Sequence, residues 1–196
     1  MTFNKLPAVI LGVSILASAL SGCSPVQNIN GGSHGSRAVL YDSVEELAAD
    51  SASVVIGTVV SQEVVADLEG SEAMFTLSTL KVSETLDDLP LGSNLSKVGL
   101  PIDSNTEVTV RQIGQREDGS SPTTILRVGE EYLLFLTPSG LTGKAASHFY
   151  VTGGNAGLYG RASDADAKSD LSSFVQVDPE EGERLPAQLS ENLAAK

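Results

Sequence analysis

The sequence has few of the residues from which disulfide-braced and metal-centred scaffolds are built. It contains one cysteine, two histidines and no tryptophan among 196 residues. One thiol cannot form an intramolecular disulfide, and one thiol with two imidazoles is too small a donor set for a Cys-rich zinc site or an iron–sulfur cluster. These shortages exclude zinc fingers and redox scaffolds, and we expect neither a cofactor nor a metal.

Basic residues are also scarce. Lysine and arginine number 12 against 25 acidic residues, which gives a net charge of −13 and a sequence pI near 4.4. A chain of this charge repels phosphate backbones unless it carries a local basic patch, and the sequence contains none. We therefore expect no nucleic-acid partner.

No hydrophobic run is long enough for a typical membrane-spanning helix. The longest, residues 6–20, has fifteen positions and is interrupted by Pro7 and Gly12, whereas a spanning helix needs about 20 predominantly apolar residues. Lys5 precedes this run, and residues 1–22 hold no acidic side chain. This layout is typical of a secretory signal peptide.

The residues that follow predict the kind of signal. Leu20, Ser21, Gly22 and Cys23 form an apolar–small–small–cysteine pattern that resembles the lipobox of bacterial lipoprotein precursors. The resemblance implies cleavage between Gly22 and Cys23, a diacylglyceryl group on the Cys23 thiol, and anchoring at the extracytoplasmic face of the cell membrane. The alternative is an ordinary free cysteine behind a plain signal peptide or a short membrane helix.

The rest of the chain divides by composition into three parts. Residues 23–36 begin with the lipidated cysteine and are rich in glycine, serine and asparagine, which predicts a flexible tether with His34 in solvent. We expect a folded β domain over 37–178 and a surface helix or disordered tail over 179–196. Removing residues 1–22, which hold one lysine and no acid, changes the net charge from −13 to −14.

The folded part is predicted to be mostly strand. Ser43 and Glu46 have the spacing of a capping box, which predicts a short helix at the start of the domain. Gly57, inside a run of β-branched residues, predicts a bend or bulge that lets one strand serve both sides of a small barrel. Alternation and β-branched composition predict strands over 54–65, 73–86, 106–113, 123–128, 132–137, 148–152 and 172–177.

Several segments resemble catalytic or ligand-binding motifs, but each lacks residues or geometry that the motif requires. The glycine-rich residues 153–160 lack the order of a dinucleotide loop and the lysine of a P-loop, so we interpret them as a tight turn and a strand crossing. Residues 164–170 lack the central glycine and closing glutamate of a calcium-binding EF-hand. Ser147 and His148 are adjacent, and adjacent strand residues point to opposite faces, which argues against a catalytic dyad.

The turns and core strands of the domain resemble a known group of proteins. The resemblance rests on residues 44–47, 54–60, 109–112, 128–136 and 153–157. They are similar to those of bacterial secreted or lipid-anchored proteins whose barrel is like the oligonucleotide/oligosaccharide-binding (OB) fold and the inhibitory domain of tissue metalloproteinase inhibitors. The resemblance implies a small, mainly antiparallel OB-like barrel. The inhibitors chelate zinc through a free N-terminal cysteine, and an acylated Cys23 behind a tether could not do so.

These observations predict a non-enzymatic, lipid-anchored domain that presents a barrel surface to a protein or glycan of the cell envelope. Two alternatives stay open: a membrane-tethered hydrolase that uses paired carboxylates, and an inhibitor or accessory subunit of an envelope enzyme. An exposed aromatic cluster drawn from Tyr132, Phe149, Tyr150 and Tyr159 would favour binding. Two carboxylates that converge in a deep pocket would favour the hydrolase.

Overall fold

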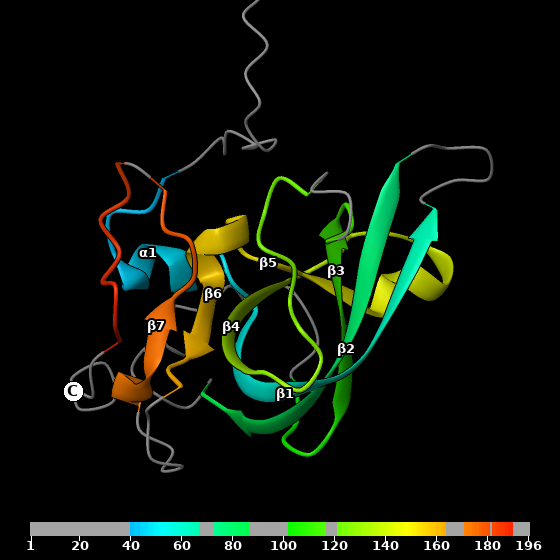
Figure 1. The fold of residues 1–196 in the computed structure, drawn as a ribbon, viewed down its shortest axis with the longest axis horizontal. Helices are drawn as coiled ribbons and strands as arrows, with labels where there is room; N and C mark the ends of the chain where they lie inside the picture. Colours follow the sequence, from blue (N-terminus) through cyan, green and yellow to red (C-terminus); the bar gives the residue numbers. More distant parts are fainter. Residues whose placement is uncertain are drawn as a thin grey trace, which may run out of the picture. The chain divides into compact units, whose positions relative to one another are not determined.

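The computed structural model describes residues 40–66, 73–86, 102–116, 121–163, 171–180 and 182–189. Every described residue belongs to one compact unit, Gly31–Lys196. The unit is mainly β, with one short α-helix (Figure 1). Its elements are α1 (Val44–Ala49), β1 (Ser53–Ala66), β2 (Met74–Thr85), β3 (Glu107–Ile113), β4 (Glu131–Pro138), η2 (Gly143–Ser147), β5 (His148–Val151), η3 (Gly154–Gly157), β6 (Leu158–Arg161), η4 (Leu171–Ser173) and β7 (Phe174–Gln176).

Helix α1 starts at the predicted capping box. The Ser43 hydroxyl accepts a hydrogen bond from the Glu46 amide at 3.2 Å, and the Glu46 carboxylate accepts one from the Asp42 amide at 3.0 Å. The first bond satisfies a backbone donor that the first helical turn cannot pair internally, and the second satisfies the amide of the residue before the N-cap. The buried face of the helix consists of Val44, Leu47 and Ala48.

The seven strands form one sheet, and five of them close a ring. The order is β1-β2-β3-β5-β4-β6-β7, and an additional pairing of β1 with β4 joins the ends of the five-stranded part. All pairings are antiparallel except β3 with β5, which run parallel. Parallel neighbours need a crossover connection, and the chain passes through β4 and η2 between them. The expectation of an antiparallel sheet is therefore correct for all pairs but this one.

Strand β1 pairs on both sides, and its register with β2 shifts at Gly57. Residues 53–58 pair with β4, while the strand also pairs with β2 along its length. The β1–β2 register shifts between Ile56 and Gly57, and a Cβ at Gly57 would lie 2.6 Å from the carbonyl oxygen of Lys81. Only glycine fits this approach, so the bulge predicted at Gly57 is confirmed.

Strand β4 is buried on both faces, as its continuous apolar run predicts. Tyr132, Leu134 and Leu136 join one hydrophobic cluster with residues of β1, β2 and β3. Leu133 and Phe135 join a second cluster that includes the apolar face of α1. Because each face of β4 packs against its own cluster, the strand carries no polar–apolar alternation.

The segment 123–128 was predicted as a strand, and this prediction is wrong: these residues form no strand. The backbone of this segment forms hydrogen bonds with side-chain amides instead of with a neighbouring strand. Gln112 donates to the carbonyl of Thr124 at 2.8 Å and accepts from the amide of Leu126 at 3.0 Å. Asn155 accepts from the amide of Thr124 at 2.9 Å. Buried backbone groups must be paired, and here distant glutamine and asparagine side chains pair them.

The C-terminal part differs from the surface helix that is one of the two forms expected for 179–196. Residues 182–189 form no helix. They pair with β7 at one isolated antiparallel bridge, between Val175 and Gln188. The predicted strand at 172–177 is present in shortened form as β7. Residues 190–196 lie outside the described part of the chain.

Candidate ligand-binding cavity

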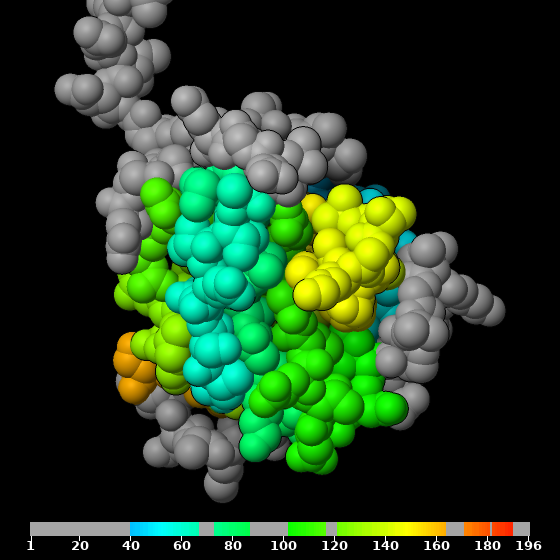
Figure 2. All heavy atoms as spheres, turned by 90° about the vertical axis from the view of Figure 1, so that its right-hand side faces the viewer, coloured from blue at the N-terminus to red at the C-terminus, as the bar shows by residue number. Residues whose placement is uncertain are grey.

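A cavity of about 450 Å³ lies where the parallel strands β3 and β5 begin. Its walls come from the turn before β3, the first residues of β3, the end of β4, and η2 with the start of β5. Figure 2 shows the segment that contains η2 and β5, in yellow, beside the green strands of this face. The lining residues are Ile102, Asp103, Thr106, Glu107, Val108, Thr109, Pro138, Ala146, Ser147, His148 and Phe149.

Local backbone structure explains why these residues meet. Strands β3 and β5 pair only at Thr109 with His148 and at Val110 with Phe149. The short pairing leaves the residues before it on each strand free to diverge. The hydroxyl of Thr106 donates to the carbonyl of Asp103 at 2.5 Å, which fixes the turn that leads into β3.

Two of the three hydroxyls that line the cavity, those of Thr106 and Ser147, donate to the backbone. Ser147 donates to the carbonyl of Lys144 at 3.2 Å, within η2, and Thr106 donates to Asp103 as described above. A hydroxyl has one proton to donate and two lone pairs that can accept. Both hydroxyls therefore keep acceptor capacity after their donor capacity is used.

The two carboxylates of the lining are Asp103 and Glu107, and both residues are exposed. Neither lysine nor arginine is among the described lining residues. Lys81 lies opposite Glu107 in the β2–β3 register, and no ion pair joins them. The wall of the cavity therefore carries negative charge.

His148 adds no positive charge to the cavity at neutral pH. Burial lowers the pKa of its imidazole below the ordinary value of 6.5, and the nearby charge of Arg111 lowers it further. Its Nδ1 atom is buried and has no hydrogen-bond partner. The guanidinium of Arg111 lies 3.8 Å from the centre of the Phe75 ring, and the residue is only 6% exposed.

The four aromatic residues proposed from sequence as a binding cluster do not come together. Tyr132 and Tyr159 are buried in the two core clusters, where burial raises the pKa of each phenol. Phe149 and Tyr150 are consecutive in β5, so their side chains leave opposite faces of the strand. Of the four, Phe149 alone lines the cavity.

Sequence reasoning found some of the cavity and missed the rest. The sequence argues against a Ser147–His148 dyad and predicts His148 to be a structural residue at a strand edge or partly buried. His148 is the first residue of β5 and half-buried, both residues line the cavity, and the Ser147 hydroxyl donates to Lys144 rather than to His148. Asp103 and Glu107 were not singled out, because their approach depends on the turn before β3. The predicted lipidation and cleavage residues, Cys23 and Gly22, lie outside the described residues, as do the aspartates of 164–170.

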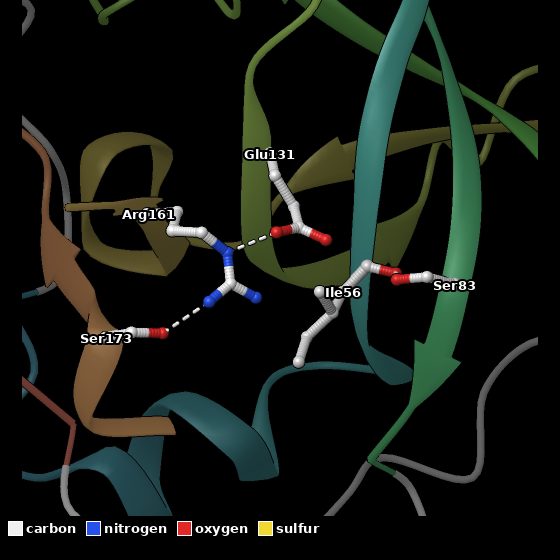
Figure 3. Close-up of polar contacts among 5 residues, drawn as sticks. All are labelled: Ile56, Ser83, Glu131, Arg161 and Ser173. Carbon is white, nitrogen blue, oxygen red and sulfur yellow. Dashed lines mark hydrogen bonds and ion pairs between the residues drawn. The ribbon is translucent and has the colours of Figure 1, made fainter. Parts of the chain in front are cut away.

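A second polar cluster links β4, β6 and the residue before β7 (Figure 3). The guanidinium of Arg161 in β6 forms an ion pair with Glu131 in β4 and donates to the Ser173 hydroxyl at 2.7 Å. The same guanidinium lies 4.5 Å from the centre of the Phe174 ring. Nearby, the Ser83 hydroxyl donates to the carbonyl of Ile56 at 3.1 Å. Every side chain here has a partner, which is typical of a structural clamp between strands.

Comparisons with models of known protein families and with curated proteins found no match for this chain. Within the described ranges, no group of three or more histidine, cysteine, aspartate or glutamate residues is placed to hold a metal ion. No helix among the described residues is both long and apolar enough to cross a membrane. The cavity and the sequence of the N-terminal segment are the features of this chain that bear on its function.

Proposed function

We propose that this chain is a lipid-anchored protein of the bacterial cell envelope whose folded part binds a ligand and has no catalytic role. The N-terminal pattern that ends at Gly22 and Cys23 supports an acylated anchor at the extracytoplasmic face of the cell membrane. Two or three acyl chains hold a protein stably on a bilayer, so the folded part needs no membrane-binding surface of its own. Its net charge of −14 after cleavage would keep it away from an anionic lipid surface.

We further propose that the folded part is an OB-like barrel. The closed order of five strands, β1-β2-β3-β5-β4, and the bulge at Gly57 support this assignment. Barrels of this kind bind ligands on a strand face and its bordering loops. The cavity beside β3 and η2 lies in such a position.

The observation that carries the binding proposal is the cavity itself. Its volume falls within the range of about 300–1,000 Å³ that is usual for small-molecule sites. Its lining combines apolar side chains such as Val108 and Phe149 with a few polar groups, which is also the usual composition. We infer that an envelope component, a glycan or part of a protein, occupies it.

One observation favours a second candidate. Asp103 and Glu107 line the same cavity, and a pair of carboxylates on one site is what a tethered hydrolase would use. If the purified protein cleaved an envelope glycan and Asp103→Asn abolished the cleavage, the non-catalytic proposal would be overturned. An inhibitor or accessory role would appear instead as a single envelope enzyme bound at the cavity.

Two measurements on cells test the proposal. The mass of the N-terminal peptide from membranes should show Cys23 as the first residue with acyl groups attached; an unmodified Cys23 would refute the anchor. A photo-crosslinking residue at Ala146, which lines the cavity, should capture an envelope molecule in intact cells. The same residue at Glu45, exposed on α1, is the control. Equal capture at both positions, or none at Ala146, would refute binding at the cavity.

A further inference from the structure

The cavity has an apolar part and an acidic part. Ile102, Val108, Pro138, Ala146 and Phe149 supply hydrocarbon surface, and Phe149 also packs against the hydrophobic cluster inside the ring. Asp103 and Glu107 supply the carboxylates. A ligand that satisfies both parts needs a compact hydrocarbon group and a group that interacts with negative charge.

The hydrogen-bonding capacity of the wall is biased toward acceptors. When ionised, Asp103 and Glu107 can only accept hydrogen bonds, and the hydroxyls of Thr106 and Ser147 already donate theirs to backbone carbonyls. Within the described part of the chain, the hydroxyl of Thr109, which also lines the cavity, keeps its donor. A carboxylate or phosphate ligand would meet negative charge and few free donors here. An ammonium group has three donors, no acceptor and a positive charge, so its needs match this wall.

The other charged and titratable groups near the cavity do not reverse this bias. His148 is neutral at neutral pH, for the reasons given above. Arg111 lies against the Phe75 ring and is almost completely buried, and Lys81 is exposed on β2. Because no lysine or arginine is among the described lining residues, a cation that enters the cavity would be a countercharge to Asp103 and Glu107 within the cavity, while Lys81 faces Glu107 from β2.

Building on the proposed function, we propose that the part of the envelope component that enters the cavity is an organic cation, an amine with a compact hydrocarbon group. The ammonium group lies between Asp103 and Glu107 and donates to them and to the hydroxyl oxygens of Thr106 and Ser147. The hydrocarbon group lies against Phe149 and its apolar neighbours. No bond is made or broken in this step.

Three matched probes test the proposal on the full chain in a nonionic detergent, since a zwitterionic detergent would itself supply a cationic group. The probes are 2-phenylethylamine, 2-phenylethanol and phenylacetate, which share a ring and differ in charge. Methyl NMR signals of Ala146, Val108 and Ile102 report occupancy of the cavity. We expect the amine to bind about tenfold more tightly than the alcohol, because hydrogen bonds to charged groups contribute more than neutral ones, and phenylacetate to bind least.

Variants separate charge from shape. Glu107→Gln should weaken binding of the amine about tenfold and leave the alcohol unchanged. Glu84→Gln, which removes an exposed carboxylate of β2 outside the cavity, is the matched control and should change neither. Equal loss in the two variants would overturn the proposal, and so would equal binding of the amine and the alcohol.

The outcomes also separate this inference from the function on which it rests. If the alcohol shifts the cavity signals and the amine binds no better, the cavity is a binding site and the preference for a cation is wrong. If none of the probes shifts these signals at millimolar concentration, the preference for this ligand class is likewise refuted. Crosslinking at Ala146 then decides by itself whether the cavity binds anything in the cell.

Discussion

Gly57 is the residue on which closure of the strand ring depends most directly. It pairs with Val82 of β2 on one side and with Tyr132 of β4 on the other. A Cβ atom at this position would lie 2.6 Å from the Lys81 carbonyl oxygen and 2.9 Å from the Leu80 Cγ atom. Backbone on one side and a core side chain on the other leave no room for relaxation.

We therefore expect Gly57→Ala to lower the free energy of unfolding by about 1–3 kcal/mol, the range usual for overpacking in a dense core. Urea denaturation monitored by circular dichroism measures the change. Ser61→Ala, at an exposed position of the same strand, is the control and should stay within about 0.5 kcal/mol of the natural chain. Equal stability of the two variants would show that the strands can separate at Gly57 without cost.

His148 gives a prediction about pH. Because burial, and secondarily Arg111, lower the folded-state pKa of its imidazole, the unfolded chain binds this proton at a higher pH than the folded chain does. The contribution of neutral His148 to stability is present above about pH 6.5 and is lost as pH falls from there through the lower folded-state pKa.

The titration can be followed on the imidazole itself by proton NMR, with His34→Gln to leave a single histidine signal. We expect a midpoint below 6.5 for His148. Arg111→Met should raise that midpoint, while leaving it below 6.5 because burial is the larger cause. A midpoint at or above 6.5 in the natural chain would contradict the neutral state on which the charge of the cavity depends.

At the scale of elements, the Arg161 side chain links β4, β6 and the residue before β7. Among these three strands, backbone pairing joins β4 to β6 and β6 to β7 but not β4 to β7, so the side-chain contacts add a link across all three. Glu131 lies at the start of β4, Arg161 at the end of β6, and Ser173 directly before β7. The side chains of Arg161 and Glu131 are only 19% and 28% exposed. Partial burial weakens solvent screening, so this pair should contribute more than a surface pair.

A second ion pair provides the comparison. Arg184 and Asp42 approach to 3.5 Å, but their side chains are 76% and 66% exposed. We expect Glu131→Gln to cost about 1–2 kcal/mol and Asp42→Asn about 0.5 kcal/mol or less. Thermal and urea unfolding of the two variants measure these values. If the two losses were the same, the Arg161 contact would be an ordinary surface pair.

The elements also show where sequence patterns are sufficient to locate secondary structure. Periodicity located α1 and most strands, because the spacing of apolar residues follows directly from which face is buried. It failed at 123–128, which has the composition of a strand but pairs with the side chains of Gln112 and Asn155. A side chain that replaces a strand partner leaves no periodic signal in the segment it holds.

At the scale of the whole molecule, β1 contributes to the ring along one half and extends beyond it along the other. Residues 53–57 are buried, and 55–58 pair on both sides, whereas 61–66 pair with β2 alone and are mostly exposed (Figure 1). Opening the first half requires the ring to break, but the second half can separate locally.

Amide hydrogen exchange should reveal this difference. We expect the amides of 54–57 to exchange only through global unfolding, and those of 62–65 to exchange orders of magnitude faster. NMR measures both sets of amides in the same sample, so a difference between their exchange rates cannot come from a difference in solution conditions. Uniform protection along β1 would contradict a ring that is closed by the β1–β4 pairing.

The sequence by itself determined the mainly β class, the capped helix, the bulge at Gly57, the two-sided burial of β4 and the N-terminal pattern that predicts an anchor at Cys23. Each of these depends on neighbouring residues and on local periodicity. Only the tertiary structure decided that β3 and β5 run parallel and that Asp103, Glu107 and His148 line one cavity. These features depend on contacts between residues about 40 positions apart, and spacing along the chain carries no information about them.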